Sequence, residues 1–119
     1  MTIEQLAELG ANTEEGLKRC MGNEAFYLKM IPKALEADRY SRLEERIKEK
    51  ELDKAFEEAH ALKGILANLS LTPILKPVNE MTELLRSRTD TDYSDFINEM
   101  WENRDRFEKV LERGEGIND

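Results

Sequence analysis

The chain has 119 residues, of which 39% are hydrophobic and 37% are charged, and its formal net charge at pH 7 is −8. This length fits one domain with a single core. The acidic balance argues against nucleic acids and anionic membranes as partners, because both are bound through Lys and Arg. A lone cysteine, Cys20, excludes an internal disulfide and indicates a reducing compartment. No apolar run approaches the roughly 20 residues of a membrane span, and residues 1–5 carry no signal-type pattern, so we expect a cytoplasmic protein.

The N-terminal part of the chain predicts short helices separated by turn residues. Residues 2–9 predict a first, short helix. Asn12, with Glu15 at the capping-box position, predicts the start of a second helix. The pair Gly22-Asn23 predicts the end of that helix and, directly after it, the cap of the next one.

A long helical pattern begins at Glu24 and extends through Ile47. Pro32 lies inside it, and an interior proline removes a hydrogen bond and bends a helix. We therefore expect one helix with a bend at Pro32. Residues 49–51 form the turn after it.

The next helix starts near Leu52 or Asp53 and ends at Ser70 and Leu71. It carries two neighbouring stripes at helical spacing. The apolar stripe, expected to face the core, consists of Phe56, Ala59, Leu62, Leu66 and Leu69. The stripe expected at the edge of the core or in solvent consists of His60, Lys63, Gly64 and Ala67.

Two further helices complete the chain. Thr72 is expected to cap the first of them, and Pro77 predicts an irregular first turn. After a polar loop, Asp92 or Thr91 is expected to cap the last helix. Gly114 and Gly116 are expected to end that helix, with the residues beyond them frayed.

The pattern as a whole predicts an all-α fold of four substantial amphipathic helices plus a short accessory N-terminal helix. The connections are short, which favours an antiparallel up-down four-helix bundle. We expect a single domain over residues 1–119 with its core at 12–112 and frayed termini. The side chains expected to be buried are Phe26, Phe56, Leu62, Leu66, Val78, Leu85, Phe96 and Phe107.

The residue inventory excludes most kinds of catalytic site. One histidine and one cysteine cannot make the usual zinc site. No glycine-rich phosphate loop or nucleophile elbow is present. A di-metal carboxylate centre needs two Glu-x-x-His pairs, and Glu57 with His60 is the one pair in the chain. We therefore expect no metal or cofactor of the protein's own.

The remaining chemical candidate is His60 with Lys63 and Gly64, which lie three and four positions after it on one helix face. A neutral imidazole is a nucleophile near pH 7, and a lysine ammonium binds phosphate as a point charge. A glycine inside a helix costs about 1 kcal/mol relative to alanine, which suggests that space beside His60 is needed. Spacing alone leaves two alternatives open: a histidine that is merely a surface residue, and a glycine that serves a close helix crossing.

These residues resemble a known family. The segments AHALKG at 59–64 and ANLSLTP at 67–73 are similar to the signature of histidine-containing phosphotransfer (HPt) domains of two-component phosphorelays. Upstream, EEGLKRCMGN at 14–23 is similar to the family's entry helix, so the resemblance covers roughly residues 12–112.

The resemblance implies a four-helix bundle in which His60 is reversibly phosphorylated. The phosphoryl group would be exchanged with an aspartate of a response-regulator receiver domain, and a hybrid histidine kinase is the other implied partner. Lys63 would hold the phosphoryl group by charge, and Gly64 would leave room for the receiver. The receiver would supply Mg²⁺.

The resemblance also assigns supporting residues. Some members place a glutamine on the next helix near the imidazole, and counting along the motif puts Thr82 there. Ser70 stands where many members carry glycine. The docking surface is expected around Ala67 and Ile31.

We therefore expect a free-standing, monomeric phosphoryl carrier without a turnover reaction of its own. The alternative is a helical-bundle adaptor that docks a receiver or kinase domain without carrying phosphate. A purely structural bundle, in which His60 is a surface residue, is a third reading. The sequence identifies neither the donor nor the acceptor.

Overall fold

The computed structural model describes residues 1–118, with side chains described through residue 113. This part of the chain is all-α, as predicted, and contains no strand. Its helices are α1 (Ile3–Glu8), α2 (Thr13–Arg19), α3 (Glu24–Ala34), α4 (Ala37–Lys48), α5 (Leu52–Asn68), α6 (Thr72–Arg86) and α7 (Ser94–Asn118).

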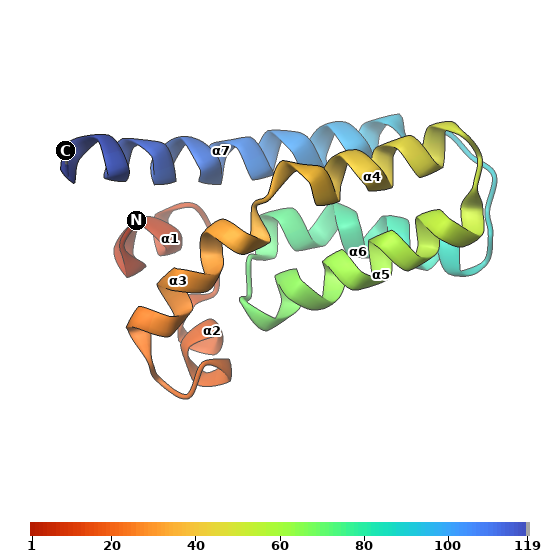
Figure 1. Ribbon diagram of the computed structural model, residues 1–119. Helices are drawn as coiled ribbons and strands as arrows, with labels where there is room; N and C mark the ends of the chain where they lie inside the picture. Colours follow the sequence, from red (N-terminus) through yellow and green to blue (C-terminus); the bar gives the residue numbers. More distant parts are fainter. Residues whose placement is uncertain (119) are drawn as a thin grey trace.

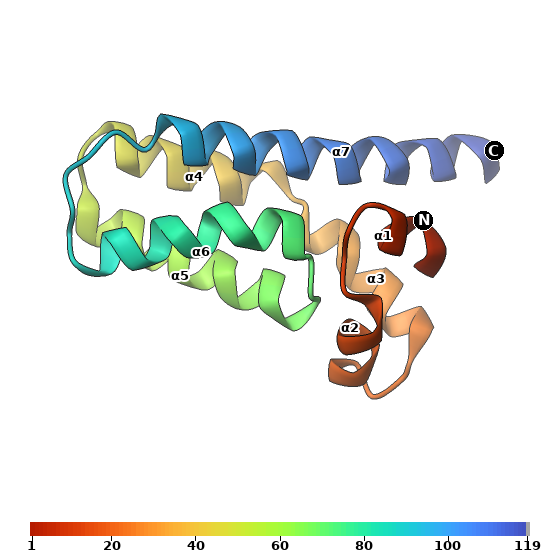
Figure 2. The ribbon, with the colours of Figure 1, turned by 180° about the vertical axis from the view of Figure 1, so that it is seen from behind.

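The four longer helices, α4 to α7, lie alongside one another, and each reverses the direction of the one before it (Figure 1). The three short helices gather at one end of this group, where α7 extends beyond α4, α5 and α6 (Figure 2). The accessory part of the fold is therefore larger than the single short helix predicted. It places α3 next to the C-terminal end of α5, the helix that carries His60.

Side-chain caps set the starts of the short helices. Thr2, Asn12 and Asn23 each accept a hydrogen bond from the backbone N–H three residues further on. Such a bond satisfies one of the free N–H groups at a helix N-terminus. The helix starts predicted at Asn12 and Asn23 are thereby confirmed.

The single bent helix predicted from Glu24 to Ile47 is wrong, because the structure has two separate helices there. The break is not at Pro32, which lies inside α3. It lies at Leu35 and Glu36, where Glu36 has a ψ of 118° and leaves the helical region. A proline perturbs the helix on its N-terminal side by removing an N–H, so it does not by itself fix where the chain turns.

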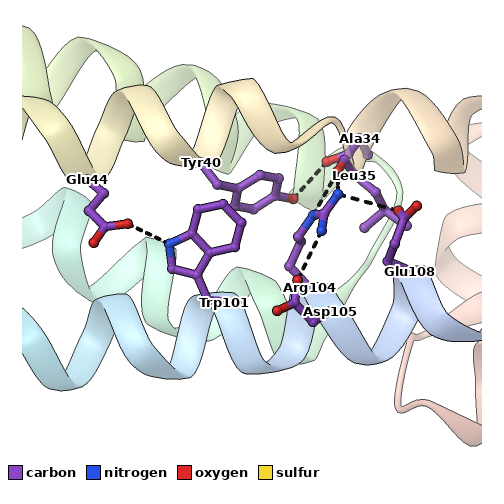
Figure 3. Close-up of polar contacts among 8 residues, drawn as sticks. All are labelled: Ala34, Leu35, Tyr40, Glu44, Trp101, Arg104, Asp105 and Glu108. Atoms are coloured by element: carbon purple, nitrogen blue, oxygen red, sulfur yellow. Dashed lines mark hydrogen bonds and ion pairs between the residues drawn. The ribbon is translucent and has the colours of Figure 1, made fainter.

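Side chains from α4 and α7 stabilise this break by binding the carbonyl groups it frees (Figure 3). The Tyr40 hydroxyl donates to the Ala34 carbonyl at 2.7 Å. The Arg104 guanidinium donates to the Leu35 carbonyl from Nε at 2.8 Å and from Nη2 at 2.6 Å. Buried carbonyls without partners would be costly, so these bonds hold the α3–α4 junction against α7.

A second set of contacts joins α4 to α7 along their length (Figure 3). The indole Nε1 of Trp101 donates to Glu44 at 2.8 Å. The Trp101 and Tyr40 rings pack with their centroids 5.8 Å apart, and the Arg104 guanidinium lies 5.9 Å from the centroid of each ring. Burial raises the pKa of Tyr40 well above its ordinary value, so its hydroxyl stays a donor.

The core agrees with the predicted one except at three phenylalanines. Phe26 is 47% exposed, so its predicted burial is wrong, and its neighbour Tyr27 is completely buried instead. The Tyr27 hydroxyl donates to the Leu69 carbonyl at 2.8 Å, which satisfies its polar atom inside the core. Phe56 and Phe96 are half-buried against the core. The predicted residues that are buried are Leu62, Leu66, Val78, Leu85 and Phe107.

Helix α6 differs from the prediction at its start. Thr72 is the first helical residue rather than the cap, and its hydroxyl donates to the Ser70 carbonyl at 3.3 Å. Pro77 is buried inside a continuous helix. The predicted irregular turn does not occur, because α6 is helical from Thr72 onward even though Pro77 removes one i→i−4 hydrogen bond, the one to the Pro73 carbonyl.

Helix α7 starts at Ser94, so Asp92 lies one position before the residue that directly precedes the helix. The Asp92 carboxylate accepts from the backbone N–H of Ser94 at 2.9 Å. The helix does not end at Gly114 and Gly116 but continues to Asn118. Glycine weakens a helix by about 1 kcal/mol without ending it. Residue 119, part of the segment expected to fray, lies outside the described residues.

The role of Arg104 at the α3–α4 junction is tested by Arg104→Met, which keeps the aliphatic stem and removes both bonds to the Leu35 carbonyl. We expect the free energy of unfolding to fall by about 2 kcal/mol, since hydrogen bonds to charged groups contribute that much. Urea denaturation followed by circular dichroism measures it. Lys109→Met, an exposed cation on the same helix, is the control and should change stability little. Equal stabilities of the two variants would contradict this account.

Candidate functional site

Helix α5 buries one face and leaves the neighbouring face in solvent. Ala55, Ala59, Leu62 and Leu66 are its buried residues. His60 lies outside this buried set and is exposed. The separation into two stripes is the one the sequence predicted, with Phe56 at the edge rather than in the core.

The imidazole of His60 stacks on the ring of Phe56, one helical turn earlier. The ring centroids are 5.6 Å apart and the planes are inclined by 21°. Two guanidinium groups also contact the Phe56 ring, with the Cζ atom of Arg86 5.2 Å and that of Arg88 5.0 Å from its centroid. Such cation–π contacts hold a ring in place, so Phe56 is an ordered support for the imidazole.

Lys63 makes an ion pair across to α6. Its Nζ atom lies 3.5 Å from Oε1 of Glu83. The other carboxylate oxygen of Glu83, Oε2, accepts from Nε of Arg86 at 3.3 Å. The hydrogen bond and charge of Arg86, followed by the charge of Lys63, lower the pKa of Glu83, so this carboxylate stays ionised.

Charged side chains of both signs lie near the stacked Phe56 and His60 rings. Lys63, Arg86 and Arg88 supply three cations, and Glu83 and Asp53 supply two carboxylates that pair with them. Arg88 also donates to backbone carbonyls at the end of α6. The arrangement favours a negatively charged group on the imidazole, because the paired cations can turn toward it.

Gly64 leaves open space beside His60. A Cβ atom built at Gly64 meets no atom within 4 Å, so a helix crossing does not explain this glycine. Gly16 in α2 is different, since a Cβ there would lie 2.5 Å from the Tyr27 hydroxyl oxygen. The glycine beside the imidazole is therefore not required by the packing of the described residues.

Two of the expected supporting residues lie elsewhere. Thr82 is completely buried, and its hydroxyl donates to the Val78 carbonyl at 2.7 Å. That hydroxyl is occupied within α6, and the next residue, Glu83, lies at the site instead. Ile31 is also completely buried, so its expected place in a docking surface is wrong. Ala67, the other expected docking residue, is half-buried.

An apolar groove of about 300 Å³ lies between α2, α3 and the C-terminal part of α5. Its apolar lining includes Phe26 and Met30 of α3 and Ile65 of α5, the residue directly after Gly64. The sequence reasoning missed it because Phe26 was assigned to the core. The signal was present in the neighbouring apolar stripe of Tyr27, Ile31 and Leu35, which is the one the structure buries.

The described residues hold no group of three or more His, Cys, Asp and Glu side chains placed to bind a metal ion. Among the helices of the same part of the chain, none is both long enough and apolar enough to cross a membrane.

An all-α protein with one exposed imidazole among paired cations has the features of a helical phosphoryl carrier. A model of the family described as Hpt domain matches residues 34–115, which is more than half of the chain. The chain belongs to this Hpt family, as the sequence resemblance predicted. Hpt domains are helical bundles that carry phosphoryl groups on histidine in phosphorelays, interact with receiver domains and kinases, and are not classical enzymes. No curated protein and no solved structure matches the chain.

The difference between the two helical glycines gives a stability prediction. Gly64→Ala should raise the free energy of unfolding by up to about 1 kcal/mol, because alanine favours the helix and the methyl group meets open space. Gly16→Ala should lower it by about 1–3 kcal/mol, because the methyl group collides with the Tyr27 hydroxyl. Thermal and urea unfolding measure both. A destabilising Gly64→Ala would show that this glycine serves packing.

Proposed function

We propose that His60 is the phosphoacceptor and that the protein exchanges the phosphoryl group with the aspartate of a response-regulator receiver domain. The observation that carries this proposal is the exposed imidazole of His60, the chain's one histidine, inside the family-matched segment. The chemistry of this family needs a histidine, and the chain has no other histidine to perform it. The ion-paired cations Lys63 and Arg86 on α5 and α6 support the same assignment.

The transfer step follows from imidazole chemistry. A ring nitrogen of His60 attacks the phosphorus atom of the receiver's aspartyl phosphate; a P–N bond forms and the P–O bond to the aspartate breaks. The aspartate leaves as a carboxylate, and the phosphorylated ring carries the charge of the transferred group. Lys63 turns toward the phosphoryl oxygens, while the receiver supplies Mg²⁺. The reverse step returns the group, so the protein is a carrier without turnover of its own.

The receiver docks over the open space at Gly64 and the groove lined by Phe26, Met30 and Ile65. Ile31 itself is buried, but Met30 directly before it lines this surface. The lining is mostly apolar and includes one charged residue, Arg19; apolar surface with polar groups beside it is the usual composition of a specific interface. Phe26, half-exposed, is the aromatic anchor.

The whole chain, residues 1–119, acts as one domain and as a monomer in this proposal. Helices α4 to α7 form its antiparallel up-down bundle, and α1 to α3 form the accessory part that completes the docking surface.

The decisive experiment mixes the protein with a phosphorylated receiver domain and follows acid-labile, alkali-stable label. Wild-type protein should take the label, and His60→Gln should take none while keeping its helical circular dichroism, since His60 is exposed. A receiver that binds wild-type protein without any transfer would instead identify an adaptor. Label on His60→Gln would place the phosphoacceptor elsewhere.

The docking surface is tested by Phe26→Ala and Gly64→Gln. Each should weaken receiver binding about 5- to 30-fold, because loss of an interface anchor or a clash costs roughly 1–2 kcal/mol. Titration calorimetry with the receiver measures the dissociation constant. Met21→Ala is the matched control, because Met21 is 94% exposed but does not line the groove. If all three variants bound equally well, the groove would not be the docking surface.

A further inference from the structure

We infer that Glu83 sets the phosphoryl-transfer equilibrium of His60 by holding Lys63 while the histidine is unphosphorylated. This inference rests on the proposed function at His60. Glu83 belongs to none of the residues expected from the sequence, and it reaches the site from α6 rather than from the helix that carries the histidine.

The carboxylate of Glu83 is divided between two cations. Its Oε1 atom lies 3.5 Å from the Lys63 Nζ atom, and its Oε2 atom lies 3.3 Å from the Arg86 Nε atom. The bond to Arg86 is within the same helix, whereas the bond to Lys63 crosses between helices. If Lys63 turns away, Glu83 stays paired with Arg86 and its charge stays neutralised. The Lys63 ammonium is therefore free to exchange partners.

The exchange is made easy by solvent. The Glu83 side chain is 54% exposed and that of Lys63 is 30% exposed. Exposed ion pairs contribute little to stability, so a better anion can displace the carboxylate from Lys63. A phosphoryl group carries nearly two negative charges and three acceptor oxygens. A phosphoryl group on His60, one helical turn from Lys63, can therefore displace Glu83 as the partner of Lys63.

Both charge effects of Glu83 act in the same direction. Pairing with Lys63 stabilises the unphosphorylated protein, and the carboxylate repels a phosphoryl group that takes Lys63 away. Glu83 therefore favours passing the phosphoryl group on to the receiver. Without it, Lys63 would be available from the start, and phosphohistidine would accumulate.

The test measures the equilibrium ratio of phosphohistidine to receiver phosphoaspartate, from either direction, for wild-type protein, Glu83→Gln and Glu80→Gln. Glu80 is an exposed residue of the same helix that makes no ion pair among the described residues, so its variant matches the change in net charge. Glu83→Gln should raise the ratio about two- to five-fold, and Glu80→Gln should leave it unchanged. At about 1 M salt the difference should shrink, because exposed charges are screened.

A second pair of variants shows whether Glu83 acts through Lys63. In a Lys63→Ala background, Glu83→Gln should change the ratio by less than it does in the wild-type background, as coupled residues do in a double-mutant cycle. Equal ratios for Glu83→Gln and Glu80→Gln, or an undiminished effect without Lys63, would overturn the inference while labelling of the wild-type protein still supported the proposed function. Failure of the wild-type protein to accept label would instead overturn the proposed function itself.

Discussion

The site depends on a rotational constraint in α5. Consecutive helical residues point about 100° apart, so the burial of Ala59 and Leu62 in the core turns His60 toward solvent. Tyr27 holds the far end of the same helix by donating to the Leu69 carbonyl. Rotation of α5 about its axis would bury the imidazole and expose core residues, so the position of the chemistry follows from the packing of the helix.

The positions of His60, Lys63 and Gly64 on one face follow from the sequence alone, because they lie on a single helix of known period. Their environment does not, because it depends on how a second helix is rotated against the first. Thr82 and Glu83 illustrate the difference. They are adjacent in the chain, yet one is completely buried and the other pairs with Lys63. An error of one residue in the expected register of α6 therefore places Thr82 at the site in the position that Glu83 occupies.

The same limit explains the errors in α3 and at its end. Assigning Phe26 to the core in place of Tyr27 is again an error of one helical position. The break at Leu35 has another cause, because the group that stabilises it comes from Arg104, 69 residues further along the chain. Local propensity pointed to Pro32, whereas the break that forms is stabilised by a distant guanidinium. Such long-range hydrogen bonds leave no local pattern in the sequence.

The junction held by Arg104 also divides the molecule into two parts with different tasks. The family match begins at residue 34, at this junction, and every residue of the cation cluster lies beyond it. The groove residues Phe26 and Met30 lie before it. One wall of the groove is thus encoded before the junction, and the other wall, with Ile65, is encoded beyond it. Under the proposed docking, substitutions in α2 and α3 would change one wall of the receiver's binding surface and leave His60 and its neighbours on α5 and α6 unaltered.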